Sequence, residues 1–192
     1  MGRVTRLVAV VAMGIVVLAG CQGDEQSPQA PAAASATQEI SPGTLAAGEK
    51  VSPPKGEVVL TMSGEIGTHN KGKQLALDIA SLEKMRTVRM EATEPFLKRK
   101  VTFEGVLLSD LLAVAGVGDS ASKINMTALD DYKVDFTVAD ARSSQMLLAT
   151  KADGKRMPVD KAGPIRIVFP DSSSLGRNPD LWIWSVSTMR LS

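Results

Sequence analysis

Residues 100–116, which read KVTFEGVLLSDLLAVAG, decide the fold class. Lys100–Phe103 carries β-branched and aromatic side chains, which favour a strand. Ser109 is a preferred N-cap residue, so we expect a helix over Asp110–Ala115 that ends at Gly116. This stretch therefore predicts a short strand followed closely by a short helix.

The same mixture of short strands and short helices extends in both directions. Asp78 is expected to cap a helix that runs through Met85, and Ala139–Ser144 to form a helical turn. Asp130-Asp131 and Asp153-Gly154 are predicted hairpin turns. Further strands are expected at Glu57–Ser63, Thr87–Thr93, Lys123–Leu129, Tyr132–Val138, Met146–Thr150, Ile165–Phe169 and Leu181–Leu191. Many strands with few short helices predict an α+β domain built on mixed β-sheets.

The N-terminus combines basic residues with an apolar run. Arg3 and Arg6 precede Leu7–Ala19, an apolar stretch well short of the roughly 20 residues that span a membrane. Leu18-Ala19-Gly20-Cys21 then fits the lipobox of bacterial lipoproteins. We therefore expect residues 1–20 to be a signal peptide and Cys21 to carry the lipid that binds the bilayer. The alternative is an ordinary signal peptide with an incidental cysteine.

The chain after the signal divides by composition. Residues 21–54 are rich in Ala, Ser, Pro, Gly and Gln, so we expect a flexible tether, with one domain at residues 55–192. The 22 basic residues nearly balance the 21 acidic ones, which argues against a nucleic-acid surface. We expect a location on the periplasmic side of a membrane. Gln22 is not the Asp that retains lipoproteins in the inner membrane of enteric bacteria, which favours the outer membrane.

An ordered set of motifs runs through the domain. In order they are Val59–Ile66, Asn70, Leu77–Leu82, Val101–Leu112, Ala128–Tyr132, Leu148-Ala149, Asp153–Lys155, Gly163–Pro170 and Trp182–Trp184. Together they resemble the oxidoreductase molybdopterin-binding domain, the sulfite-oxidase-like fold, over about residues 57–191. The resemblance implies mixed β-sheets around a central cofactor cleft. It also implies molybdopterin as the cofactor, held in catalytic members through a cysteine thiolate.

The cysteine that the resemblance requires is missing. Counted back from Gly105, Glu94 falls where the thiolate is expected, and Cys21 is the only cysteine of the chain. Arg3 and Arg6 are not adjacent, so the chain lacks the twin-arginine pair that exports folded, cofactor-loaded proteins. We therefore expect no bound cofactor and favour a non-catalytic role, with molybdopterin kept as an alternative on the resemblance alone.

Several polar and aromatic residues are candidates for a ligand or cofactor cleft, and each has a structural alternative. Asn70 faces the cleft or caps a turn, and Thr93 and Glu94 line it or form a polar turn before Pro95. Arg166 lies in an apolar strand, where it points outward or points inward and needs a carboxylate or a ligand anion. We expect Asn70, Thr93, Glu94 and Arg166 to converge.

Four further candidates come from the C-terminal half. Asp130 and Tyr132 lie at a cleft rim or simply in a hairpin turn. Arg177 is a candidate anion contact in a loop, and Trp182 either stacks on a ligand or packs in the core. His69, the only histidine, is expected in an exposed loop.

Three functions are open at this point. The first is a lipid-tethered module that binds a small anionic ligand or a membrane sensor protein of a signalling system. The second is a molybdopterin-dependent oxidoreductase of the sulfite-oxidase type. The third is a structural lipoprotein of the envelope.

Overall fold

A computed structural model describes residue 2 and residues 36–192 of the chain. The compact unit spans Ser35–Ser192. The expected signal peptide and the lipidation site at Cys21 lie outside the described residues. Within the described part of the chain, no helix is long and apolar enough to cross a membrane.

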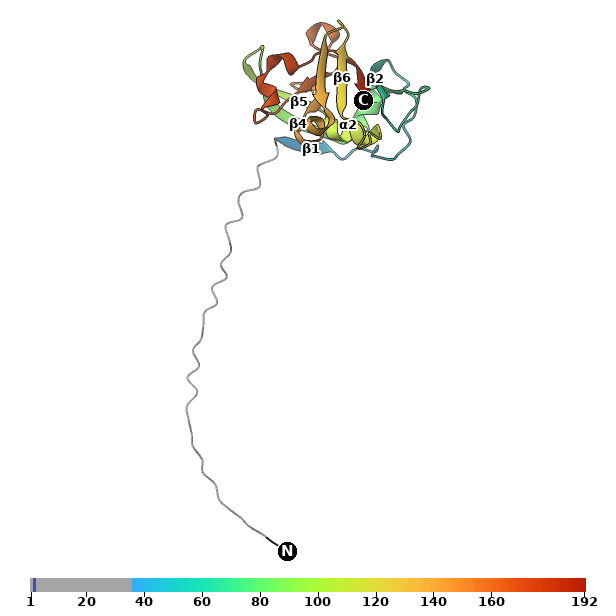
Figure 1. Cartoon of the computed structure of the whole chain (residues 1–192). Helices are drawn as coiled ribbons and strands as arrows, with labels where there is room; N and C mark the ends of the chain where they lie inside the picture. Colours follow the sequence, from blue (N-terminus) through green and yellow to red (C-terminus); the bar gives the residue numbers. More distant parts are fainter. Residues whose placement is uncertain (1, 3–35) are drawn as a thin grey trace. The chain divides into compact units, whose positions relative to one another are not determined.

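Two β-sheets make up the described domain (Figure 1). One has the order β1-β4-β5-β8-β10, with β9 paired to β8, and consists of β1 (Thr37–Ser41), β4 (Thr87–Glu94), β5 (Arg99–Leu107), β8 (Leu147–Ala152), β9 (Lys155–Arg156) and β10 (Arg166–Val168). The other has the order β3-β2-β11-β6-β7, and consists of β2 (Val58–Gly64), β3 (Leu75–Asp78), β6 (Lys123–Ala128), β7 (Lys133–Thr137) and β11 (Val186–Leu191). β2 and β11 are parallel, whereas the other pairs are antiparallel, so the sheets are mixed as expected.

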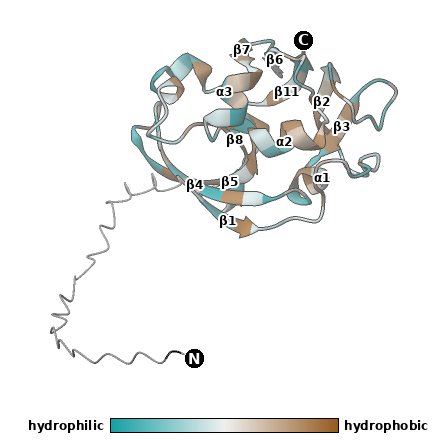
Figure 2. Cartoon of the chain, turned by 60° about the horizontal axis from the view of Figure 1, so that its bottom comes forward, coloured by the Kyte–Doolittle hydropathy of each residue, from teal (hydrophilic) through white to brown (hydrophobic). Residues whose placement is uncertain are grey.

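The helices are short. They are α1 (Ile79–Glu83), α2 (Leu108–Val114), α3 (Val138–Ser143) and the 3₁₀ turns η1 (Val159–Lys161), η2 (Leu175–Arg177) and η3 (Pro179–Leu181). Figure 2 shows α1, α2 and α3 between the strands β1, β4 and β5 and the strands of the other sheet. Short helices beside two sheets confirm the predicted α+β class and its sulfite-oxidase-like architecture.

Helix ends show one correct and one wrong cap prediction. The Asp78 side chain accepts a hydrogen bond from the Ser81 amide, so Asp78 caps α1 as expected. Ser109 caps nothing, because α2 already begins at Leu108 and its N-cap is Leu107. The Leu108 amide instead donates to the Met146 carbonyl at 2.8 Å. Met146 directly precedes β8, so this hydrogen bond satisfies one of the helix amides that a cap would otherwise satisfy.

Alternation along β4 places the core on one side of its sheet. Val88, Met90 and Ala92 are fully buried, while Arg89 and Glu91 are exposed. Phe103 on β5 and Leu111 on α2 are also buried in the core. The parity of β4 therefore decides which of its polar residues face inward, because side chains of a strand point to opposite faces in turn.

The segment before residue 55 is part of the fold. β1 pairs antiparallel with β4, with Thr37 opposite Met90 and Glu39 opposite Val88 (Figure 1). Val51 is also buried in the core. The prediction of a flexible tether over 21–54 is therefore wrong from Thr37 onward. The polar composition of this segment suggested a flexible chain. An edge strand, however, is held by backbone hydrogen bonds and needs few large apolar side chains.

The predicted hairpins and the last strand can be compared residue by residue. Asp153 and Gly154 both have positive φ angles, of 47° and 74°, and join β8 to β9 as predicted. Asp130 and Asp131 connect β6 to β7, also as predicted. The last strand begins only at Val186 rather than at Leu181, because η3 and an irregular loop containing both tryptophans come first.

Candidate functional site

A buried ion pair lies where the resemblance expects the centre of the site. Glu94 ends β4 and Arg166 begins β10, and the Glu94 Oε1 to Arg166 Nη2 distance is 2.9 Å. Their side chains are only 1% and 6% exposed. Arg166 therefore points inward and meets a carboxylate, as a buried guanidinium requires.

The other oxygen of Glu94 organises the turn after β4. Oε2 accepts hydrogen bonds from the amides of Phe96 at 2.8 Å and of Leu97 at 2.6 Å. The Lys98 amide donates to the Glu94 carbonyl at 2.8 Å, which closes the turn. Both carboxylate oxygens are thus engaged by donors of the protein itself.

Arg166 has hydrogen-bonding capacity that the protein leaves unused. Its Nε is buried without a partner in the described structure, and a guanidinium offers five N–H donors in all. The rings of Phe103, Trp182 and Trp184 surround its central carbon, with ring centroids at 5.6, 5.9 and 5.0 Å. Burial lowers the pKa of Arg166, and the hydrogen bond and charge of Glu94 oppose that shift.

A pocket of about 330 Å³, the basic pocket, opens on one side of this pair. Its apolar lining is Leu97, Val101, Phe103, Ala152, Met157 and Pro158, and its charged lining is Glu94, Arg99, Asp153, Lys155, Arg156, Lys161 and Arg166. Arg99 is paired with Asp153 at 3.1 Å and Arg156 with Glu83 at 2.5 Å. Lys155 and Lys161 are exposed and form no ion pair with any residue that the structure describes. The basic pocket therefore combines an apolar interior with unpaired positive charge.

A second pocket, of about 270 Å³, lies near the two tryptophans. This aromatic pocket is lined by Phe96, Ala128, Asp130, Tyr132, Pro179, Asp180, Trp182 and Trp184. Three candidates from the sequence, Asp130, Tyr132 and Trp182, meet in it. Trp182 is also 5% exposed and its Nε1 donates to the Gly176 carbonyl at 2.9 Å, so it packs in the core as well. Arg166 approaches rings from both pockets and therefore lies between them.

Three candidates do not join the ion pair. Thr93 faces outward, one residue out of phase with Glu94, and its amide and hydroxyl bind the Asp171 carboxylate at 2.6 and 3.1 Å. Asn70 bonds to Ser52 and Ala76, so it holds a turn rather than facing the pair. Arg177 is exposed at the end of η2 and lines neither pocket. The expected convergence is therefore right for Glu94 and Arg166 and wrong for Thr93 and Asn70.

The residues that sequence reasoning missed are mainly the cations of the basic pocket and the aromatic neighbours of Arg166. Lys155 follows the Asp153-Gly154 turn, and Lys161 lies in η1, between β9 and β10. The turn was visible in the sequence, but the return of β9 toward Glu94 was not. Phe96 and Trp184 contact each other with ring centroids 4.9 Å apart, a pairing between distant segments that carries no local signal.

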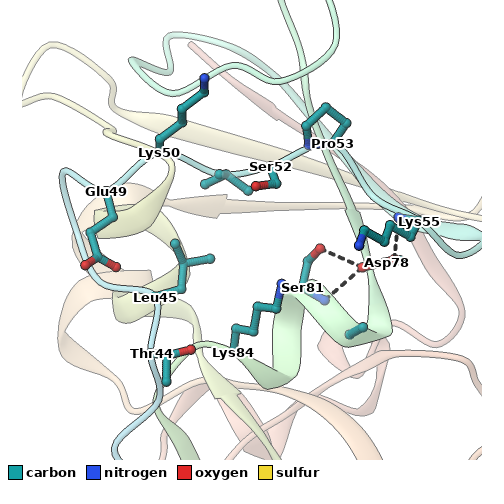
Figure 3. A pocket seen from close by; sticks show the side chains of 12 residues that line it. Thr44, Leu45, Glu49, Lys50, Ser52, Pro53, Lys55, Asp78, Ser81 and Lys84 are labelled. Carbon is teal, nitrogen blue, oxygen red and sulfur yellow. Dashed lines mark hydrogen bonds between the residues drawn. The ribbon is translucent and has the colours of Figure 1, made fainter.

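A third pocket, polar and of about 670 Å³, is lined in part by Asp78 (Figure 3). Here the Asp78 carboxylate has a structural role. Burial on its own raises the pKa of Asp78, but hydrogen bonds from Ser81, Gly56 and Lys55 outweigh it and lower the pKa to about 2. The same carboxylate thus caps α1 and holds the backbone at Lys55-Gly56. Since its oxygens are occupied in this way, we assign Asp78 a structural role.

Comparison with known proteins places the domain in a family. A family model for the oxidoreductase molybdopterin binding domain matches residues 70–178, more than half of the 192 residues. The chain belongs to this family. Among solved structures, the domain is similar to the sulfane dehydrogenase SoxCD from Paracoccus pantotrophus, with a TM-score of 0.53 and 18% sequence identity. A search of curated proteins gives no match.

The likeness to SoxCD concerns the fold. The match covers 69% of this chain but only 37% of the SoxCD chain, so this molybdopterin-binding-domain protein corresponds to little more than a third of it. The shared architecture and the family match support the mixed-sheet domain that the sequence resemblance implied.

The residues of this family member do not fit a molybdenum centre held by a thiolate. The described residues contain no cysteine. At Glu94, where the sequence resemblance implies the thiolate, the two carboxylate oxygens accept hydrogen bonds from Arg166, Phe96 and Leu97. A metal at Glu94 would have to displace these donors, and Arg166 would then lose its buried partner. Over the described residues, no three His, Cys, Asp or Glu side chains gather to hold a metal ion.

Proposed function

We propose that this protein is a non-catalytic member of the molybdopterin-binding-domain family whose basic pocket binds a small organic anion. The observation that carries the proposal is the buried Arg166, which has an unpartnered Nε and lines a pocket. A guanidinium holds a carboxylate or phosphate by parallel, charge-assisted hydrogen bonds. Glu94 neutralises Arg166 through one nitrogen only, which leaves other donors for a ligand.

The composition of the basic pocket favours a particular ligand class. The apolar residues Val101, Phe103 and Met157 suit a hydrocarbon or aromatic body. The exposed Lys155 and Lys161 add positive charge that attracts an anion and raises its association rate. The ligand is therefore an anionic headgroup on an apolar body, of a size that suits about 330 Å³.

The non-catalytic assignment is supported by Glu94. A carboxylate whose oxygens are taken by internal hydrogen bonds does not supply the thiolate ligand of the catalytic relatives. Catalytic molybdopterin chemistry remains the second candidate because of the family match. One molybdenum per chain in protein purified from its native periplasm would favour that candidate, whereas a clearly substoichiometric content agrees with our proposal.

The setting that we propose is the periplasmic face of a bacterial membrane, with the outer membrane preferred. The lipobox ending at Cys21 supports a lipid anchor in the bilayer. From this position the domain would present its ligand to a membrane sensor protein of a signalling system.

The binding proposal is tested by calorimetric titration with hexanoate, and with hexanamide as the uncharged control. We expect saturable binding of hexanoate and at least about tenfold weaker binding of hexanamide, a difference that corresponds to about 1.4 kcal/mol. The double variant Lys155→Gln/Lys161→Gln should weaken hexanoate binding several-fold and reduce its salt dependence. Lys133→Gln, which removes an exposed charge from β7, is the matched control and should leave binding unchanged. Equal affinities for the acid and the amide would overturn the proposal.

A further inference from the structure

We propose that the aromatic pocket is a binding site for a methylated ammonium group, separate from the anion site. The chain contains four Phe, two Trp and one Tyr. Both tryptophans, the single tyrosine and Phe96 line this one pocket of about 270 Å³. Such a concentration of rings in a chain with 4% aromatic residues calls for a reason beyond core packing.

The rings are held in place with much of their surface exposed. Phe96, Tyr132 and Trp184 are 53%, 46% and 39% exposed, although large apolar side chains usually gain by burial. The Tyr132 hydroxyl donates to the Asp180 carbonyl at 2.9 Å, and Phe96 meets Trp184 edge to face at 73°. The Tyr132 contact uses its hydroxyl and leaves its ring faces free. The Phe96–Trp184 contact covers a face of one of these two rings, and the Arg166 guanidinium lies over the Trp184 ring. The exposed remainder of each ring is therefore held in a fixed arrangement.

The charges of the pocket favour a cation. Its charged lining residues are Asp130 and Asp180, and its lining contains no Lys or Arg. One oxygen of Asp130 accepts from the Tyr132 amide at 3.2 Å, while the Asp180 carboxylate has no partner among the described residues. The Arg166 guanidinium lies 5.0 Å from the centroid of the Trp184 ring, and Glu94 pairs with it at 2.9 Å. Aromatic faces and free carboxylates together attract a cation.

The lining selects among cations. Ca²⁺ takes six to eight oxygen ligands, which two carboxylates beside aromatic rings do not provide. A bare ammonium would lose water without gaining enough hydrogen-bond acceptors to replace it. A methylated ammonium is weakly hydrated and spreads its charge over methyl groups, so ring faces and nearby carboxylates suit it.

The proposal is tested with choline and its uncharged carbon analogue 3,3-dimethylbutan-1-ol. Because Trp184 lines the pocket, tryptophan fluorescence reports binding directly. We expect a saturable change with choline and at least about tenfold weaker binding of the analogue, a difference that corresponds to about 1.4 kcal/mol. Equal affinities of choline and 3,3-dimethylbutan-1-ol would overturn the proposal. A fluorescence change with glucose, a neutral sugar, but none with choline would also overturn it.

Matched variants locate the site. Asp130→Asn and Tyr132→Leu should each weaken choline binding several-fold, because one removes a charge and the other removes a ring. Asp131→Asn is the control: Asp131 is exposed, adjacent in sequence and outside the lining, and Asn tolerates its φ of 67°. If Asp131→Asn weakens binding as much as Asp130→Asn, the pocket is not the site. Hexanoate titration of the same variants should stay unchanged, which separates this site from the basic pocket.

Discussion

Glu94 and Arg166 are 72 residues apart in sequence, and their side chains meet at 2.9 Å between a basic pocket and an aromatic one. This contact links the end of β4 to the start of β10. The Glu94 carboxylate also holds the turn that contains Phe96 and Leu97, because it accepts hydrogen bonds from the backbone amides of both residues. One acidic side chain therefore connects the fold, the ion pair and a wall of each pocket.

Removal of one partner of the Glu94–Arg166 ion pair should lower the free energy of unfolding. Arg166→Met leaves the Glu94 charge buried without its counterion, and we expect a loss of about 3–5 kcal/mol in the free energy of unfolding. Glu94→Gln/Arg166→Met should recover a clear part of this loss, because no buried charge remains. Urea unfolding of the wild type and both variants measures the effect. A loss below about 1 kcal/mol for Arg166→Met would contradict the buried pair.

β1 should contribute measurably to stability. We compare a protein that begins at Ala36 with one that begins at Lys55. The shorter protein loses the pairing of β1 with β4 and the burial of Val51, so its melting temperature should fall by at least about 4 °C. Equal melting temperatures would show that the segment before residue 55 does not stabilise the domain.

The Asp78 carboxylate should make stability depend on pH in the acid range. Its pKa is about 2 in the folded protein and about 3.9 in an unfolded chain. A lowered folded-state pKa adds stability that is complete above about pH 4 and is lost as the pH falls toward 2. The difference in pKa corresponds to about 2.6 kcal/mol of folding free energy.

Asp78→Asn tests this relation. The variant should be less stable than the wild type at about pH 6, and the gap should narrow between about pH 4 and pH 2. Asp119→Asn removes a fully exposed carboxylate and serves as the control. A gap that stays constant over this range would show that Asp78 titrates as an ordinary carboxyl group.

The proposed lipid anchor has a direct test. Cys21→Ser removes the thiol that accepts the lipid, so the precursor should accumulate and the protein should leave the detergent phase of a Triton X-114 partition. Gln22→Ala keeps the thiol and should behave as the wild type. Processing and detergent partition of Cys21→Ser like those of the wild type would refute lipidation.

The sequence predicts features whose cause is local. The Asp153-Gly154 hairpin follows from two residues that accept positive φ angles, and the cap at Asp78 follows from one side chain. For Arg166 the sequence left the inward and outward directions open, and the structure shows that it points inward and pairs with Glu94. The direction of Glu94 also has a local cause: Met90 and Ala92 face the core, so the same alternation turns Glu94 inward and Thr93 outward.

Other features depend on tertiary placement. β1 has the sequence Thr-Gln-Glu-Ile-Ser, and most of its side chains are exposed. It forms a strand because its backbone pairs with the edge of β4. Lys155 and Lys161 line the same pocket as the ion pair, because β9 pairs with β8 and the chain then continues through η1. The meeting of Phe96 with Trp184 requires the β4–β5 turn and the loop before β11 to come together, which no local pattern encodes.

The position of β1 has a consequence for self-association. β4 is an eight-residue strand, and β1 covers the side of it that faces away from β5. Without β1, the backbone N–H and C=O groups along that side would be free to pair with another copy of the chain, as open sheet edges do. The short, polar β1 ends the sheet with a strand that offers little for such pairing. A segment that contributes little to the core thus protects the domain from aggregation.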